Sequence, residues 1–238
     1  MSRTAPKRTL VIDLDSCTGC HACTIACKGW QNANEDTRLP DAEAYGKAPF
    51  GAFLNRVHSY EVIADGAPAQ LIHYPRTCVH CENPPCVPVC PTGASHQTAD
   101  GLVQIDARRC LGCGLCAWAC PYGARELDPV AGVMRKCTLC ANRIDDPARP
   151  EEERIPACVR ACPTGARHFG DPSDAESPLG RLVAERGGFA PMPEFGTQPT
   201  SRYLPPRPKD RLGAGAGLEP LVPGGGLQDW LDKLLGRG

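Results

Sequence analysis

Apolar and polar residues alternate over several short segments of this chain, and turn-forming residues separate the segments. Segments of this kind predict β-strands that pair locally as hairpins. A strand is expected over residues 9–14, and hairpins are expected to join 56–63 to 70–74, 94–97 to 102–105, and 126–127 to 133–134. Asp100-Gly101 stands between the two segments of the second hairpin, where a tight turn favours such a pair.

The C-terminal part of the chain has a different pattern. Ser177 is expected to cap a helix over 178–186, which has proline in its first turn and stops at Gly187. Apolar residues at helical spacing predict a short amphipathic helix over 227–235. Ten of the 25 prolines lie in residues 171–238, and proline interrupts helices and sheets alike. We therefore expect 171–238 to be an extended Pro/Gly-rich tail with a short terminal helix.

Two segments are candidates for partner contacts. Residues 31–53 form a long polar stretch punctuated by Gly and Pro. Connections of this length are usually functional or disordered, and we favour a partner contact over a mobile surface loop. The terminal helix has two alternatives, which are docking on a partner or the membrane rim and packing against the chain itself.

Composition shows that a large apolar core does not organise the fold. Sixteen of the 238 residues are cysteine, whereas only 5% are aromatic. The net charge of −1 gives no general attraction to nucleic acid, so no such partner is expected. No run of about 18 apolar residues is present, so no transmembrane segment is expected, and residues 1–10 lack the pattern of an export signal. Cysteines in a reducing cytosol indicate metal ligands before disulfides.

The cysteines fall into four groups of four with none left over. Group one is Cys17, Cys20, Cys23 and Cys27; group two is Cys78, Cys81, Cys86 and Cys90; group three is Cys110, Cys113, Cys116 and Cys120; group four is Cys137, Cys140, Cys158 and Cys162. Groups one and three have the C-x2-C-x2-C-x3-C spacing of bacterial [4Fe–4S] ferredoxins. In that pattern three thiolates wrap one cubane cluster, and the fourth ligates the other cluster of the module. We expect the fourth cysteine to start a short helix.

A five-residue phrase, Cys-Pro-x-Gly-Ala, occurs at 90–94, 120–124 and 162–166. Such repetition indicates duplicated modules. Cysteine loop, short helix and hairpin then alternate along the chain, as is typical of ferredoxin modules.

Zinc, disulfides and a redox-active cysteine pair are the alternatives to clusters. Zinc suits the pairs Cys78/Cys81 and Cys137/Cys140, but the compact spacing of groups one and three is poor for a tetrahedral ion. Dense neighbours and the absent export pattern disfavour disulfides. The surroundings of the cysteines do not resemble a thioredoxin unit. Four cubanes are the interpretation that we favour.

Clusters would add negative charge, about −2 for each oxidised cubane with its four thiolates. Nearby basic residues are expected to offset part of this charge, or else to be ordinary solvated charges. They are Lys28, Arg108, Arg109, Arg135, Lys136, Arg143 and Arg160. His21 and His80, inside cysteine loops, are expected to tune clusters through hydrogen bonds.

In group four, a wide gap of 17 residues separates Cys140 from Cys158. This gap, the order of the groups and the repeated phrase resemble the four-cluster iron–sulfur (beta) subunit of the dimethyl sulfoxide reductase superfamily of molybdenum and tungsten bis-pterin enzymes. The resemblance covers about residues 9–206. It implies an α+β fold of two bacterial-ferredoxin-like modules with the long insertion and the C-terminal tail. The first module is 1–77 with 137–170, including the insertion 31–53; the second is 78–136; the tail is 171–238.

The resemblance also implies how the cysteines share four [4Fe–4S] clusters, with group one paired to group four and group two to group three. Cys113 is present, so a three-iron cluster, as in relatives that lack a group-three cysteine, is not expected. We call the four sets sites 1 to 4. Site 1 is Cys17, Cys20, Cys23 and Cys162; site 2 is Cys27, Cys137, Cys140 and Cys158; site 3 is Cys78, Cys81, Cys86 and Cys120; site 4 is Cys90, Cys110, Cys113 and Cys116.

A subunit of this type implies an electron-transfer role without catalysis of its own. Its expected partners are a large molybdopterin catalytic subunit at site 1 and a polytopic, quinone-reactive membrane subunit at site 4. The expected location is the cytoplasmic face of the inner membrane, where the partner subunits hold the chain. A free polyferredoxin and a zinc-bound scaffold remain alternatives.

Four phrases indicate the branch of the superfamily. They are Cys20-His-Ala-Cys23, Lys28-Gly-Trp30, Phe53-Leu-Asn-Arg-Val57 and Cys137-Thr-Leu-Cys140. They resemble the subunit of membrane-bound sulfite dehydrogenases, so sulfite oxidation is the expected activity of the complex. Phenylacetyl-CoA, thiosulfate or polysulfide, and tetrathionate oxidoreductases have similar phrases and remain open.

Overall fold

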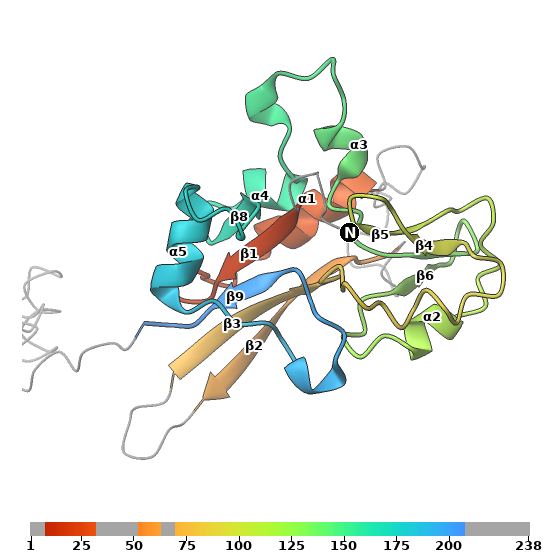
Figure 1. Cartoon of the computed structure of the whole chain (residues 1–238), viewed down its shortest axis with the longest axis horizontal. Helices are drawn as coiled ribbons and strands as arrows, with labels where there is room; N and C mark the ends of the chain where they lie inside the picture. The colour runs from red at the N-terminus through yellow and green to blue at the C-terminus, as the bar shows by residue number, and fades with distance from the viewer. Residues whose placement is uncertain (1–7, 32–51, 63–69, 208–238) are drawn as a thin grey trace, which may run out of the picture. The chain divides into compact units, whose positions relative to one another are not determined.

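The computed structural model of this protein describes residues 8–31, 52–62 and 70–207 (Figure 1). Residues 1–206 belong to one unit, and residues 207–238 to another. Among the described residues, no helix has the length and apolar character needed to cross a membrane.

Strand β1 (Thr9–Asp13) is the middle strand of a three-stranded sheet. It pairs antiparallel with β8 (Arg167–Gly170) and parallel with β9 (Arg202–Leu204). All five residues of β1 are buried, as expected for an apolar segment covered on both faces. The strand predicted over 9–14 is thus confirmed, and its two partners come from the last third of the described chain.

The three predicted hairpins are confirmed. Each is an antiparallel pair of neighbouring strands, because each is specified by an alternating pattern and a local turn. The pairs are β2 (Asn55–Val62) with β3 (Gln70–Thr77), β4 (Ser95–Gln97) with β5 (Val103–Ile105), and β6 (Glu126–Asp128) with β7 (Val133–Arg135). The two short hairpins lie together beside α2 on one side of the unit, and β2 and β3 extend away from it (Figure 1).

Short helices follow the cysteine loops, but they do not begin where we expected. They are α1 (Ala22–Gln31), α2 (Leu115–Trp118), α3 (Ala141–Ile144) and α4 (Ala157–Arg160). The expectation that the fourth cysteine starts the helix is wrong, because in α2 and α4 the third cysteine lies inside the helix, which ends before the fourth. Third and fourth cysteines are four residues apart, so about one helical turn joins them.

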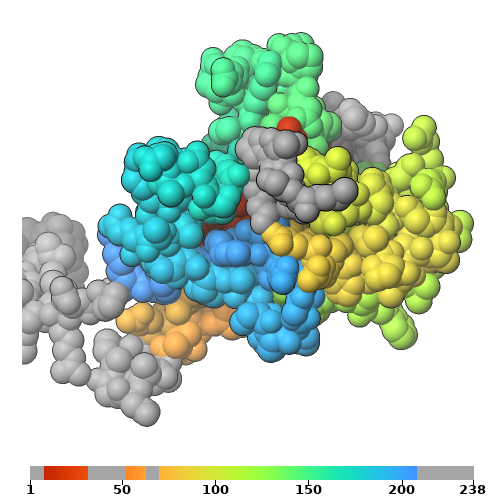
Figure 2. Space-filling model, viewed as in Figure 1, coloured from red at the N-terminus to blue at the C-terminus, as the bar shows by residue number. Residues whose placement is uncertain are grey.

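Residues 171–206, expected to be the first part of the tail, lie in the same unit as the cysteines. Helix α5 (Pro178–Arg186) confirms the predicted helix: the Ser177 hydroxyl accepts a hydrogen bond from the Gly180 N–H at 2.9 Å, and Gly187 follows with φ of 62°. Strand β9 then pairs with β1. This segment, cyan to blue, covers much of the face in Figure 2.

Ion pairing at α5 and aromatic stacking at β9 attach the C-terminal segment to the rest of the unit. Asp13 accepts two hydrogen bonds of 3.2 Å from Arg186. The fully buried Tyr203 stacks on Tyr74 with ring centroids 4.5 Å apart and donates its hydroxyl to the Pro75 carbonyl at 2.9 Å. The C-terminal segment is thereby held at both α5 and β9.

The described residues also contain two 3-10 helices, Glu151–Glu153 and Pro193–Phe195. Residues 32–51 of the insertion and the terminal helix expected over 227–235 lie outside the described residues. The division of the chain into two ferredoxin-like modules and a tail stays a prediction.

Candidate iron–sulfur cluster sites

Three cavities are each lined by the four cysteines of one expected site. Site 1 lines a cavity with His21 and Arg167, site 3 lines one with Tyr122 and Arg125, and site 4 lines one with Leu115. The space between the atoms measures about 320, 310 and 340 Å³, respectively, and part of it is open to solvent. The fold therefore gathers the cysteines in the sets that the resemblance implied.

The four cysteines of site 2 are buried together. Burial, followed by the neighbouring thiols of Cys137, Cys158 and Cys140, raises the pKa of Cys27 well above its ordinary value. Helix α1 carries Cys27, Cys140 stands directly before α3, and α4 carries Cys158. Three separate helices thus bring these thiols to one place.

The donor set fits an iron–sulfur cluster. Each site offers four thiols, the ligands typical of cubane clusters. Within the part of the chain that the structure describes, no three Cys, His, Asp or Glu side chains form a group that could hold a single metal ion. In sites 1, 3 and 4 the thiols instead surround a cavity. The ligation of clusters by these particular cysteines stays a prediction.

The repeated Cys-Pro-x-Gly-Ala phrase curls the backbone around its own cysteine. Gly93 has φ of 63°, a conformation that glycine adopts readily. The turn directs the Ser95 N–H to Cys90 Sγ at 3.4 Å and brings the Thr92 hydroxyl within 3.6 Å of the same sulfur. Burial opposes the shift, but these hydrogen bonds lower the pKa of Cys90 to about 7. Cys162 in the last copy of the phrase also has a lowered pKa.

Burial has the opposite effect on other thiols. It raises the pKa of Cys81 and Cys140 to about 12 and that of Cys158 to about 11. Neutral pH therefore leaves these three protonated in the metal-free chain. Because ligating cysteines must be thiolates, a cluster that bound at these sites would displace protons from them.

Sites 1 and 4, which we call the outer sites, each have an exposed cysteine, whereas sites 2 and 3 have none. Cys20 of site 1 and Cys113 of site 4 are exposed. All four cysteines of site 2 are buried, as are three of the four cysteines of site 3. Solvent and any partner protein therefore meet site 1 and site 4 first.

Packing brings the cysteine sites into contact with one another. Sites 1 and 2 share helix α1, and Cys23 and Cys158 interact electrostatically. Site 3 adjoins site 2, because His80 of the site 3 loop interacts with Lys136 and the Cys137 backbone. One packed cluster of buried side chains contains Cys23, Cys137, Cys158 and Cys78. A second contains Cys86 of site 3 and Cys116 of site 4.

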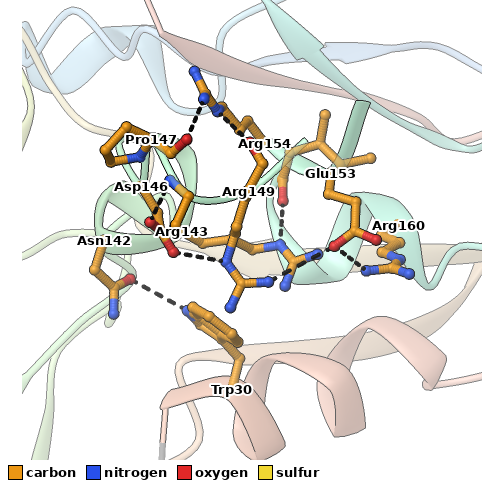
Figure 3. Close-up of polar contacts among 11 residues, drawn as sticks. Trp30, Asn142, Arg143, Asp146, Pro147, Arg149, Glu153, Arg154 and Arg160 are labelled. Carbon is orange, nitrogen blue, oxygen red and sulfur yellow. Dashed lines mark hydrogen bonds and ion pairs between the residues drawn. The ribbon is translucent and has the colours of Figure 1, made fainter. Parts of the chain in front are cut away.

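The wide gap of group four is folded back over helix α1 (Figure 3). The Trp30 indole N–H donates to the Asn142 side-chain oxygen at 3.3 Å. The guanidinium groups of Arg143 and Arg149 lie 5.0 and 5.1 Å from the Trp30 ring centroid, within the range of cation–π attraction. The Trp30 side chain thus contacts the 17-residue gap near its start and again at Arg149, beside site 2.

Ion pairs close the same segment on itself (Figure 3). Arg149 pairs with Asp146 at 3.2 Å and with Glu153 at 3.7 Å, and Glu153 also pairs with Arg160 at 3.4 Å. In Figure 2 the segment, in green, projects from the surface. Its fold therefore depends on polar and cation–π contacts more than on an apolar core.

The basic residues that we expected near the clusters have mixed environments. Lys136 is buried and donates to the Cys137 carbonyl. Lys28 lies 3.9 Å above the Phe53 ring, and the Arg108 side chain is 92% exposed. The pKa of the fully buried His80 is well below its ordinary value because of burial and, next, Lys136, so the ring is neutral and accepts the Val103 N–H at 3.2 Å.

Two buried arginines were missed by the sequence reasoning. Arg125 is 6% exposed and donates from Nη2 to Cys86 Sγ at 2.7 Å. Arg167 is 4% exposed, lies beside site 1, and interacts with Cys158. Each follows a copy of the Cys-Pro-x-Gly-Ala phrase directly, which is the signal that could have found them.

Comparison with known proteins indicates an iron–sulfur protein. Residues 69–172 match the family model of the 4Fe-4S dicluster domain. The chain is 51% identical to the B subunit of sulfite dehydrogenase from Allochromatium vinosum over 199 residues, covering 83% of this chain and 82% of the relative. It is 37% identical to the B subunit of tetrathionate reductase from Salmonella typhimurium, covering 83% and 72%. It is also 37% identical to the B subunit of polysulfide reductase from Wolinella succinogenes, covering 84% and 95%.

The family match defines a class of protein that contains a 4Fe-4S dicluster, ferredoxin-like domain. Within that class, this protein belongs to the family of iron–sulfur subunits of molybdoenzyme complexes. Members of this family are electron-transfer components, so the expected role without catalysis of its own is confirmed.

Proposed function

We propose that the chain holds four [4Fe–4S] clusters, one at each of sites 1 to 4, and relays electrons through them in that order. Bound clusters would supply one-electron redox chemistry, and the protein supplies ligands, spacing and exclusion of water. The observation that carries the proposal is the pattern of exposure. An exposed cysteine at each outer site and buried cysteines at site 2 suit a path that exchanges electrons only at its two ends.

The surface around site 4 supports docking of a membrane partner there. Leu111, Leu115 and Trp118 are exposed apolar side chains next to the cysteines of site 4, and Trp118 is 91% exposed. Exposed apolar clusters mark interaction surfaces, and aromatic residues often carry much of the binding energy. We assign this surface to a quinone-reactive membrane subunit and site 1 to a pterin-binding catalytic subunit. The chain would then be peripheral, on the cytoplasmic face of the inner membrane.

Sulfite oxidation is the reaction that we propose for the complex. Support comes from the relative named as a sulfite dehydrogenase subunit, which is 51% identical, whereas those named for tetrathionate and polysulfide are 37% identical. The chain itself supplies the electron path and does not choose the substrate.

Metal analysis of the anaerobically purified chain tests the four clusters. About 16 iron atoms per chain, equal acid-labile sulfide and broad absorbance near ~400 nm are expected from four cubanes. About four zinc atoms and no colour would replace the proposal with a zinc-bound scaffold. About eight iron atoms would mean that only two sites are filled.

Activity of the assembled complex tests the role and the substrate. Co-expression with a large pterin-binding subunit and a quinone-reactive membrane subunit is expected to give sulfite-dependent quinone reduction that is lost without this chain. Equal activity with tetrathionate or polysulfide, and none with sulfite, would assign a different branch. A chain that remains alone and reduces several unrelated enzymes would be a free polyferredoxin.

A further inference from the structure

Two arginines occupy equivalent positions in the two pairs of cysteine sites. Arg125 and Arg167 each stand directly after a Cys-Pro-x-Gly-Ala phrase, and Arg167 opens strand β8 whereas Arg125 precedes β6. After the first copy of the phrase the same position is Ser95. One arginine of this kind therefore accompanies sites 1 and 2, and one accompanies sites 3 and 4.

Each arginine lies between two sites. Arg125 donates to Cys86 of site 3 at 2.7 Å and also interacts with Cys116 of site 4. Arg167 lines the cavity of site 1 and interacts with Cys158 of site 2 and Cys23 of site 1. Both guanidinium groups thus face the sulfur ligands of neighbouring sites at once.

The charge of both groups is buried without a carboxylate partner. None of the ion pairs among the described residues includes Arg125 or Arg167. The hydrogen bond from Arg167 Nη2 to the Asn55 side-chain oxygen, at 2.6 Å, is to a neutral group. A buried cation without a counter-charge is strongly unfavourable. The thiolates and clusters of the neighbouring sites would supply the negative charge that balances each arginine.

Each guanidinium also has a donor that remains unused. The Nη1 atoms of both arginines are buried and make no hydrogen bond to the described residues. Buried donors are nearly always satisfied in native proteins. Arg167 and Arg125 line the cavities of sites 1 and 3, respectively, where cysteine sulfur offers acceptors to N–H donors.

We propose that Arg125 and Arg167 are shared counterions, each of which donates hydrogen bonds to sulfur at two neighbouring cluster sites and raises the reduction potentials of that pair. The proposal rests on the proposed function, because it assumes that the sites hold clusters. One-electron reduction adds negative charge to a site, and a fixed positive charge with N–H donors favours the reduced state. Both arginines are positioning residues, since the cysteines are the ligands.

Electron paramagnetic resonance during redox titration of the full chain tests this assignment. The variants are Arg125→Gln and Arg167→Gln, which remove the charge, and Arg125→Lys and Arg167→Lys, which keep it. Arg108→Gln is the matched control, because it removes an exposed arginine two residues before Cys110.

Each Gln variant is expected to lower the midpoint potentials of two clusters and leave the other two unchanged. The expected change is at least tenfold in the reduction equilibrium of each affected cluster, or about 59 mV for a one-electron couple. The Lys variants should shift less than the Gln variants, and Arg108→Gln should shift none. These results would support the proposal.

Unchanged potentials in both Gln variants at full iron loading would overturn the proposal, as would equal shifts for Lys and Gln. If a Gln variant loses iron, its Lys variant decides: a loaded Lys variant with two shifted clusters supports a shared counterion, and iron loss in the Lys variant as well overturns it. Failure of the proposed function is distinguishable, because the unaltered chain would then lack about 16 iron atoms and the cluster signals.

Discussion

Gly112 and Gly114 stand two residues apart in the group-three loop, and both have positive φ angles, 67° and 78°. Their surroundings differ. A Cβ on Gly112 would lie 2.3 Å from the Gly132 carbonyl oxygen, whereas a Cβ on Gly114 would meet nothing within 4 Å. Both substitutions strain the backbone, but only one also forces two backbone segments apart.

We therefore predict that Gly112→Ala disrupts site 4 and that Gly114→Ala does not. The left-handed conformation costs an alanine about 1–2 kcal/mol in either place. Gly112→Ala has the additional backbone clash and should lose about four of 16 iron atoms. Iron and sulfide content of the two purified variants checks this, and equal content in both would show that the Gly132 contact does not matter.

The cysteines that are candidate ligands could be predicted from the sequence, because their spacing is characteristic. The sixteen cysteines and their four groups follow from spacing that is visible in the chain, whereas the division into sites 1 to 4 comes from the family resemblance and stays a prediction. Arg125 and Arg167 were missed because an isolated arginine in a sequence usually indicates a solvated surface. Only the fold shows that they are buried between thiols.

Helix α1 holds site 2 from two sides, since it carries Cys27 and presents Trp30 to the wide gap of group four. The gap has little apolar packing of its own. Removing the Trp30 ring would remove its cation–π contacts with two arginines and its hydrogen bond to Asn142.

Trp30→Ala is accordingly predicted to expose site 2 without preventing its assembly. Iron release to a chelator should become severalfold faster for about four iron atoms, since cation–π contacts contribute about 0.5–2 kcal/mol each. Trp118→Ala is the control, because it removes a ring that is almost fully exposed, and it should release iron at the normal rate. A normal rate in Trp30→Ala would mean that the ion pairs alone hold the gap.

Elements were predictable where their signals are local. The hairpins and helix α5 follow from alternation, turn residues and the Ser177 cap. The start of the cluster helices was mispredicted because loop and helix share the same few residues. The parallel pairing of β1 with β9 could not be predicted, because nothing local in residues 9–13 specifies a partner near residue 203.

At the scale of the whole molecule, the exposed surface beside site 4 is the one to which we assign the membrane subunit. Leu111, Leu115 and Trp118 give the site 4 surface an apolar character. An apolar ring that becomes buried at an interface is often a major contributor to binding.

Trp118→Ala is predicted to weaken binding to the membrane subunit at least tenfold, about 1.4 kcal/mol, with iron content unchanged. Affinity for vesicles that contain the membrane subunit measures the effect, and Trp30→Ala serves as the control for this surface. Undiminished binding of Trp118→Ala would place the membrane partner elsewhere.

Site geometry also has a consequence for how the protein is made. Sites 3 and 4 draw their cysteines from residues 78–120, so they are complete early in synthesis. Site 1 waits for Cys162, and β1 waits for β9 at residues 202–204. Non-local pairings form late, and the chain emerges from its N-terminus. With the proposed ligand sets, the ribosome exposes Cys17, Cys20 and Cys23 well before their fourth ligand, so site 1 cannot be completed until Cys162 has been synthesised.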